Sequence, residues 1–296
     1  MRTIFTLASG RSGTRFLHEL ITRNARDCVS KHEPYLTNPS MFGRAIYAHA
    51  TGDQRYVREL LAKKRKVVAQ FEPKTYVETS HAFLKSWFDL APEYFPDTQA
   101  VHLMRHPFAV ARSFVNREAF IRKLRVPFTT YRGDDAQPYF YWTLTGLEPI
   151  FRLYTGRRLS RFQWYLLEWI EIENRAARFL ALRGGAARCV RLRVPEDIND
   201  ASRLRDLFDQ LGLEARGDLF DQSGFRNATP GRPTRIGALE MREAGELLAR
   251  LPDEHLAIFR TEAYAACDWA ELLTSRATTL GYATAMPPRM QRAASA

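Results

Sequence analysis

The chain has 296 residues, enough for one large domain or two small ones, and its 45% hydrophobic and 26% charged content is ordinary for a globular protein. Its net charge is +11, and arginine carries the excess, because only seven of the 44 basic residues are lysines. Arginine makes forked contacts with phosphate, sulfate or carboxylate. Since the arginines are spread along the chain and form no basic tail, we expect an anionic small ligand and no nucleic-acid partner.

The cysteines and the hydropathy pattern exclude several protein classes. Cys28, Cys189 and Cys267 are far apart and odd in number, so they predict neither a disulfide framework nor a metal site, and they fit a reducing compartment. No run approaches the roughly 18 apolar residues of a membrane span. A special turn begins at residue 8 and leaves no room for a signal peptide before it. We therefore expect a cytoplasmic protein without a membrane span.

Short apolar or β-branched runs alternate with longer helical patterns, which predicts βαβ units and an α/β fold. The expected strands are residues 2–9, 26–32, 74–80, 98–105 and 187–194. The expected helices are residues 13–24, 40–70 with a break at 51–53, 83–91, 107–120, 161–183, 200–213 and 238–251. Residues 125–160 form a predicted irregular, aromatic-rich insert, 222–237 a loop and 286–296 a mobile tail. We predict a single domain over residues 1–285, with a parallel sheet flanked by helices.

The first predicted strand is followed at once by "ASGRSGTRFLHEL", residues 8–20. Backbone N–H groups between a strand end and a helix start make a site for a phosphate-like anion, and Gly10 and Gly13 allow the tight path. A Walker A loop needs four residues between its glycines and a following Gly-Lys-Ser/Thr, whereas here only two residues intervene and no lysine follows. An ATPase or GTPase loop therefore fits poorly. The remaining alternative is a glycine turn that only caps a helix.

The turn resembles the 5′-phosphosulfate loop of sulfotransferases that use 3′-phosphoadenosine 5′-phosphosulfate (PAPS). Their core is Lys/Arg-Ser/Thr-Gly-Ser/Thr-Ser/Thr, and here it reads "RSGTR". The resemblance implies that Arg11 is the loop cation and that Ser12, Gly13 and Thr14 donate hydrogen bonds to the 5′-phosphate. Arg15 departs from the usual hydroxyl residue, and it could instead pair with a glutamate one turn further on.

Two later segments extend this resemblance. "HLMRHPFAVARSFV" is similar to the 3′-phosphate motif of the family, in which an arginine at a strand end precedes a helical serine by eight residues, as Arg105 precedes Ser113. Arg105 alone could equally be a surface arginine. Residues 190–213 resemble a late strand, acidic turn and helix, in which Glu196 and Asp197 are expected to brace the helix. The three matches imply the sulfotransferase fold, with a P-loop NTPase-like parallel sheet, and PAPS as the donor.

Sulfuryl transfer requires a base for the attacking hydroxyl and a cation for the departing nucleotide. Arg11 is the candidate cation, acting through its charge alone because arginine stays protonated. The base is left open among Glu33 in "KHEPY", our first choice, and Glu78 or His81 in "YVETSHAF". Each of the three could instead be structural. No metal is required and no metal-ligand cluster is visible.

The acceptor is expected to be a carbohydrate or other small molecule, because aromatic residues gather at 139–142 and again at Trp164, Tyr165 and Trp169. The helix aromatics could equally be core. The run "AKKRK", residues 62–66, is expected to be a solvated face. Two other functions stay open: a small-molecule kinase with a P-loop-like turn, and a non-catalytic protein that binds nucleotides or nucleic acid. The sequence indicates no oligomeric state.

Overall fold

The computed structural model describes residues 1–34, 39–182, 188–217 and 235–274. Five strands form a parallel sheet in the order β2-β3-β1-β4-β7. The strands are β1 (Arg2–Leu7), β2 (Cys28–Lys31), β3 (Thr75–Glu78), β4 (Gln99–Arg105) and β7 (Cys189–Val194). The central strand β1 pairs Ile4 with Val77 of β3 and with Gln99 of β4. The predicted α/β fold with a parallel sheet is therefore confirmed, strand for strand.

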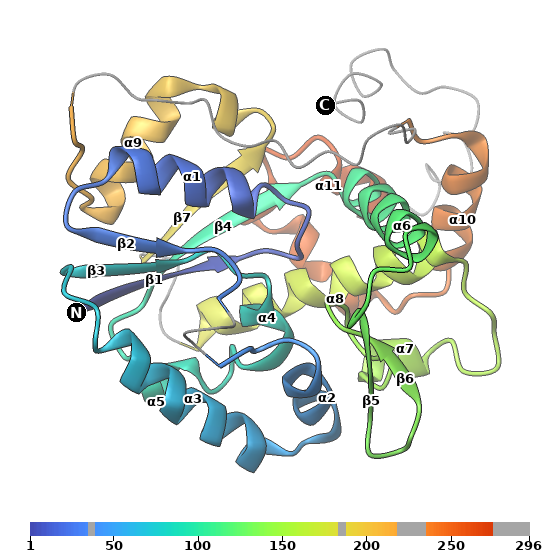
Figure 1. Ribbon diagram of the computed structural model, residues 1–296. Helices are drawn as coiled ribbons and strands as arrows, with labels where there is room; N and C mark the ends of the chain where they lie inside the picture. The colour runs from blue at the N-terminus through green and yellow to red at the C-terminus, as the bar shows by residue number, and fades with distance from the viewer. Residues whose placement is uncertain (35–38, 183–187, 218–234, 275–296) are drawn as a thin grey trace.

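The strands are apolar because both faces of the sheet are covered. Successive residues of β1 point to opposite faces, so Phe5 and Leu7 join one buried cluster while Ile4 joins the other. Helices α1 (Thr14–Asn24) and α9 (Ala201–Leu211) cover the second face, and the larger group of helices covers the first (Figure 1). The molecule thus has three layers, and each connection between β1 and β7 returns the chain to the same sheet.

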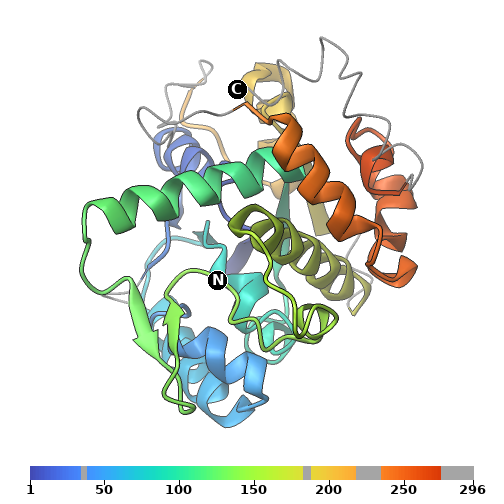
Figure 2. The same cartoon turned by 90° about the vertical axis from the view of Figure 1, so that its right-hand side faces the viewer.

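The helices on the larger side come from all parts of the chain after β2 except α9 (Figures 1 and 2). They are α2 (Arg44–Thr51), α3 (Gln54–Val68), α4 (Ala82–Ser86), α5 (Ala91–Tyr94), α6 (Pro107–Lys123), α7 (Pro149–Arg152), α8 (Arg161–Ala181), α10 (Ala238–Leu248) and α11 (Ala270–Thr274). The described residues also form short 3₁₀ turns: η2 (Asp197–Asn199), η3 (Asp253–His255), η4 (Ala257–Arg260) and η5 (Glu262–Tyr264). Pro107 occupies the first turn of α6, where a missing N–H costs nothing.

Two predicted segments differ in detail from the structure. The insert at 125–160 contains an antiparallel hairpin, β5 (Thr130–Arg132) with β6 (Pro138–Phe140), in addition to α7. The helix predicted at 83–91 is two short helices, because Trp87 leaves helical backbone at the end of α4. The greater part of the predicted loop at 222–237, and the predicted tail at 286–296, lie outside the described residues. Within the described residues, no helix is both long and apolar enough to cross a membrane.

Candidate active site

The turn after β1 has the strained path that its glycines predict. Gly10, Arg11 and Gly13 all lie in the left-handed region, with φ of 87°, 56° and 91°. A Cβ atom on Gly10 would lie 3.0 Å from ring atoms of both His81 and Phe114, so a larger residue would need these rings to move. Helix α1 begins directly after Gly13, which provides no side-chain cap. The turn therefore presents backbone N–H groups at the positive end of a helix.

The second motif meets the first at Arg11. The Arg11 Nε atom donates to Ser113 Oγ at 3.0 Å, and the guanidinium of Arg105 donates to the Arg11 carbonyl oxygen at 2.7 Å. Arg105 ends β4 and Ser113 lies two turns into α6, so the β4–α6 crossing is in direct contact with the β1–α1 crossing. Parallel sheets collect ligands at this carboxyl edge of their strands. The structure thus brings both sequence motifs into one place.

The cations of this edge destabilise one another. Burial, together with the charges of Arg117 and Arg105, lowers the pKa of Arg11 to about 10, and Glu33 opposes the shift only in part. Burial also lowers the pKa of Arg105, against the attraction of Glu196. Both side chains remain charged at neutral pH. An anion placed among these three guanidinium groups would relieve both the repulsion and the lost solvation.

The remaining loop residues lie as follows. Ser12 is buried, and its hydroxyl donates to the Gly10 carbonyl oxygen at 3.1 Å, so it braces the turn from within. Thr14 is buried at the first position of α1. Arg15 is half exposed, and its Nε atom lies 3.8 Å from Glu19 Oε1, an i to i+4 pair along the helix. Arg15 therefore lies on the outer side of α1 and is braced there by Glu19.

Two candidate bases form one dyad. His81 Nε2 lies 3.2 Å from Glu33 Oε1, and His32 Nε2 is 3.8 Å from the same oxygen. Burial alone would raise the pKa of Glu33, but the charge and hydrogen bond of His81, with His32 and Lys85, lower it to about 2. Glu33 also has a left-handed backbone, with φ of 46°. Its carboxylate is therefore ionised and held in a fixed position at neutral pH.

The protonation of His81 follows from its surroundings. Burial, and then the nearby charge of Lys85, lowers the pKa of His81 to about 4, so the imidazole is neutral at pH 7. Only a protonated Nε2 can donate to the Glu33 carboxylate, which leaves Nδ1 as the unprotonated nitrogen. The Nδ1 atom is buried without a hydrogen-bond partner among the described residues. His81 therefore orients Glu33 and has no exposed proton acceptor of its own.

Glu78, the third candidate, lies elsewhere. Its carboxylate accepts from Lys64 Nζ at 2.5 Å and from the Tyr76 hydroxyl at 2.6 Å, and all three side chains are buried. This ion pair ties α3 to β3. The expectation that residues 62–66 form a solvated face is wrong at Lys64. This residue lies three positions after the buried Leu61, so it is on the same face of the helix and points inward.

A buried lysine lies behind the dyad. Lys85 is on α4, one turn after His81, and its Nζ atom donates to Glu168 Oε1 at 2.5 Å and to the Trp142 carbonyl oxygen at 2.6 Å. It therefore joins α4, α8 and the end of the hairpin insert. Its charge also acts on both Glu33 and His81. Neither this residue nor Arg117 was singled out from the sequence, although each stands four residues after a candidate, which places it on the same helix face.

Comparison with solved structures finds chains of similar architecture. A sulfotransferase from Alicyclobacillus acidocaldarius shares 15% identity at a TM-score of 0.45, over 93% of this chain and 96% of that one. The sulfotransferase domain of the Synechococcus PCC 7002 olefin synthase shares 14% at 0.43, over 97% and 89%. The sulfotransferase domain from the curacin biosynthetic pathway shares 14% at 0.39, over 99% and 95%. All three are sulfotransferases. No family model and no curated sequence matches the chain.

Within the part of the chain that the structure describes, no group of three or more potential metal ligands comes together. The donors gathered at the sulfotransferase-like turn are guanidinium, hydroxyl and backbone N–H groups, which suit oxyanions rather than metal ions.

Aromatic side chains lie beside the dyad on the side of the insert. The Phe42 ring is 4.7 Å from the His81 ring and 6.0 Å from that of Tyr141, measured between centroids. Tyr141 packs over Gly43, where a Cβ atom would come within 2.6 Å of its ring. Of the insert aromatics, Tyr141 therefore approaches the dyad, through Phe42, whereas Tyr165 and Trp169 are buried in the core on α8.

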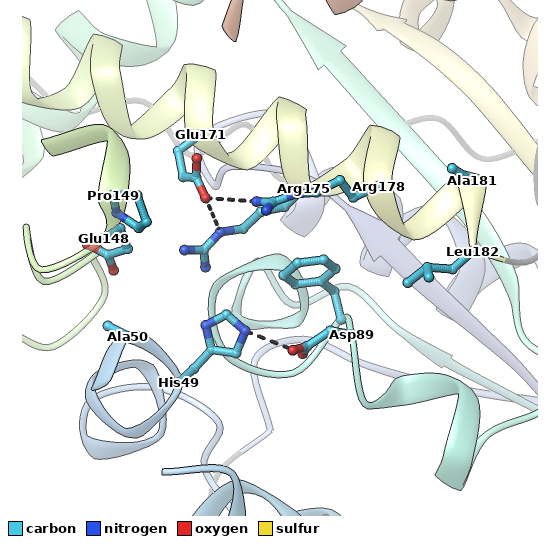
Figure 3. A pocket seen from close by; sticks show the side chains of 11 residues that line it. His49, Ala50, Asp89, Glu148, Pro149, Glu171, Arg175, Arg178, Ala181 and Leu182 are labelled. Carbon is cyan, nitrogen blue, oxygen red and sulfur yellow. Dashed lines mark hydrogen bonds and ion pairs between the residues drawn. The ribbon is translucent and has the colours of Figure 1, made fainter. Parts of the chain in front are cut away.

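A pocket of about 590 Å³ opens on the larger side of the molecule, between α2, the α4–α5 turn, the start of α7 and the end of α8 (Figure 3). His49 and Asp89 face Glu171, Arg175 and Arg178 across it. Both arginines donate to Glu171 Oε1, at 2.7 and 3.0 Å, so their charges are already partly balanced. Among the described residues that line this pocket, none is a predicted site residue. The pocket is therefore separate from the turn.

Proposed function

We propose that this protein is a sulfotransferase that moves the sulfuryl group of PAPS to a hydroxyl of a carbohydrate or other small molecule by in-line displacement. One observation carries the proposal. Arg105 and Ser113, which come from a separate βα crossing, both bond to Arg11 of the glycine turn. Two anion-binding motifs that are far apart in sequence therefore share one edge of the sheet, as a nucleotide with phosphates at both its 5′ and 3′ positions requires.

The residues at this edge fit such a nucleotide. Backbone N–H groups of the turn, with Thr14 and Arg11, would hold the 5′ end. Arg105 and Ser113 would hold the 3′-phosphate. Gly10 lets the turn pack directly against the rings of His81 and Phe114, which places the turn beside the dyad. Burial and the charges of Arg117 and Arg105 lower the pKa of Arg11, and an anion bound beside it would offset both effects.

When bound, PAPS supplies the sulfuryl group. The carboxylate of Glu33 accepts the proton of the acceptor hydroxyl, since it is ionised at neutral pH. His81 donates to Glu33 Oε1 and so holds the carboxylate in position. Arg11 places a fixed positive charge where negative charge grows on the departing phosphate, which its always-protonated guanidinium stabilises without transferring a proton. The aromatic side chains beside the dyad would exclude water and position the acceptor ring.

Titration calorimetry with adenosine 3′,5′-bisphosphate, in the absence of magnesium, tests the proposal. We expect the bisphosphate to bind more tightly than adenosine 5′-monophosphate. Arg105→Ala should weaken bisphosphate binding by about 2 kcal/mol or more, because a hydrogen bond to a charged group is lost, and should leave the monophosphate nearly unaffected. Arg55→Ala, an exposed arginine paired with Glu59 on α3, is the control and should bind like the native chain.

Three outcomes would contradict the proposal. Equal affinity for the bisphosphate and the monophosphate would remove the 3′-phosphate site. A requirement for magnesium together with preference for a nucleoside triphosphate would favour the kinase. Binding that falls steeply with salt and ignores the 3′-phosphate would favour a non-catalytic nucleic-acid binder.

A further inference from the structure

The segment between α6 and β5 exposes apolar side chains at three alternating positions. Leu124 is 56% exposed, Val126 39% and Phe128 91%. In Figure 2 the chain turns here at the outer end of α6, at the edge of the molecule, before it enters the hairpin insert. Most of the other large apolar side chains of the described residues are buried. An exposed group of this kind marks a surface that is covered in use.

The backbone fixes this protrusion. At the end of α6 the Val126 N–H donates to the Ile121 carbonyl oxygen at 3.2 Å, and Arg125 adopts a left-handed φ of 49°, which forms a Schellman cap. Phe128 has a left-handed φ of 58°, unusual for a bulky residue. Thr129 then pairs with Tyr141 of the hairpin. Phe128 is therefore held outward by ordered backbone on both sides, at a cost in strain that burial of the ring within the protein does not offset.

Positive charge surrounds these apolar groups. Residues 122–132, "RKLRVPFTTYR", which we name the basic loop, contain Arg122, Lys123, Arg125 and Arg132 and no acidic residue. Arg122 is partly balanced by Glu118, at 2.7 Å, while Lys123 and Arg125 are exposed. The basic loop thus combines protruding apolar side chains with cations directly beside them.

We infer that the basic loop docks on an anionic lipid surface. Apolar side chains that protrude singly, without a groove between them, fit the disordered boundary of acyl chains better than the shaped surface of a protein. Lysine and arginine beside them would lie at the depth of the headgroups and attract anionic lipids. The attachment is peripheral, by a loop. The docking concerns a surface apart from the glycine turn and does not rest on the proposed function, whereas its consequence for the acceptor does.

The location has a functional consequence. The basic loop ends with β5, which pairs with β6, and the residue after β6 is Tyr141, which packs on Gly43 beside the dyad. A membrane bound at the basic loop would therefore face the acceptor side of the proposed site. An acceptor carried at the surface of a membrane could reach the site without leaving the lipid.

Vesicle sedimentation tests this inference with the full chain and no nucleotide. Vesicles of phosphatidylcholine alone are compared with vesicles that contain phosphatidylserine as well, at low and at physiological salt. We expect binding to the anionic vesicles only. Phe128→Asp should weaken it about ten-fold or more, since a ring that leaves water on binding is lost. Lys123→Gln and Arg125→Gln should each weaken it about five-fold. Phe128→Trp, which keeps a large apolar ring at this position, should bind like the native chain.

Leu239→Asp is the control, because Leu239 on α10 is an apolar residue that is 53% exposed. It introduces the same charge elsewhere and should bind like the native chain. The inference is overturned if the native chain ignores anionic vesicles, or if Phe128→Asp and Leu239→Asp bind alike. It is also overturned if light scattering shows a dimer that Phe128→Asp converts to a monomer without any vesicle binding. That result would assign the basic loop to a second copy of the chain.

Discussion

Two regions of this protein bury charged side chains, and they do so in opposite ways. In the core beneath the sheet, Lys64 meets Glu78 and Lys85 meets Glu168, each pair at 2.5 Å. At the carboxyl edge of the strands, Arg105 is partly buried with a carbonyl oxygen as its partner, and it forms no ion pair with any described residue. Arg11 lies next to it under the repulsion of two further arginines.

The difference separates charges that stabilise the fold from charges that we propose bind a ligand. A buried ion pair is complete without any other molecule, and breaking it is costly because one charge is left alone. A group of buried cations is instead stabilised by an anion that arrives from outside, which couples ligand binding to stability. Four substitutions or conditions test this distinction, starting with the largest expected effect.

Of the changes tested, loss of the ion pair between Lys85 and Glu168 should lower the free energy of unfolding the most. Glu168→Gln leaves the buried ammonium of Lys85 without its carboxylate, and we expect the free energy of unfolding to fall by about 3–5 kcal/mol in urea titrations. Glu246→Gln, an exposed glutamate on α10, is the control and should change it by less than about 0.5 kcal/mol. If Glu168→Gln were as mild as the control, the Lys85 pair would not be a structural charge pair.

The dyad should dominate turnover. Glu33→Gln removes the carboxylate that we propose as proton acceptor, and we expect kcat to fall about 100-fold or more while affinity for adenosine 3′,5′-bisphosphate stays unchanged. His81→Gln should lower kcat less, because it removes only the group that orients the carboxylate. The double variant should resemble Glu33→Gln, since both side chains act through one carboxylate. Additive losses, or undiminished turnover in Glu33→Gln, would contradict this assignment.

The sequence predicted most of the fold because the strands and helices follow strong hydrophobic periods and clear end signals. Ser160 and Gln163 form a capping box at the start of α8, and Gly212 ends α9. The site was harder to predict from the sequence. Arg105 and Ser113 could be named from their spacing, but the link between Glu33 and His81 depends on how the chain after β2 packs against α4. Tertiary packing of this kind leaves no local signal.

Tertiary packing also explains why Lys64 was wrongly expected to be solvated. A run such as "AKKRK" is polar at every position but one, so composition predicts a solvated face for all of it. The helical period nevertheless turns Lys64 inward, and only the position of Glu78 on a neighbouring strand makes that burial tolerable. Sequence patterns identify the face of a helix, whereas the partner of a buried charge comes from another part of the chain.

Arg117 lies near Arg11, and it tests whether a third cation there also affects ligand binding. Its charge acts on Arg11, and it lies one turn after Ser113 on α6. We expect Arg117→Ala to weaken binding of the bisphosphate about five-fold, a loss of about 1 kcal/mol, since its charge is partly screened by solvent. Stability without nucleotide should stay level or rise slightly, because repulsion is removed. Arg242→Ala on α10 is the control. A fall in stability without nucleotide would place Arg117 among the structural charges.

The smallest expected effect is on the pH dependence of folding. Burial lowers the pKa of both His81 and His106 to about 4 in the folded protein, from about 6.5 when unfolded. Below pH 6.5 the unfolded chain therefore binds more protons, so stability falls as the pH drops from 6.5 towards 4. Each histidine should contribute about 0.7 kcal/mol of loss between pH 7 and 6.

Single variants separate the two histidines. His81→Gln and His106→Asn should each remove about half of this slope in urea titrations at pH 7 and 6, and asparagine preserves the cap that His106 provides for α6. The pKa of His18 is lowered in the same direction, and its contribution stays constant in every variant. If His81→Gln kept the full slope, His81 would be protonated in the folded state. The dyad would then be an ion pair, complete within the protein like the pairs of the core. Glu33 would then be a structural charge and not the proposed proton acceptor.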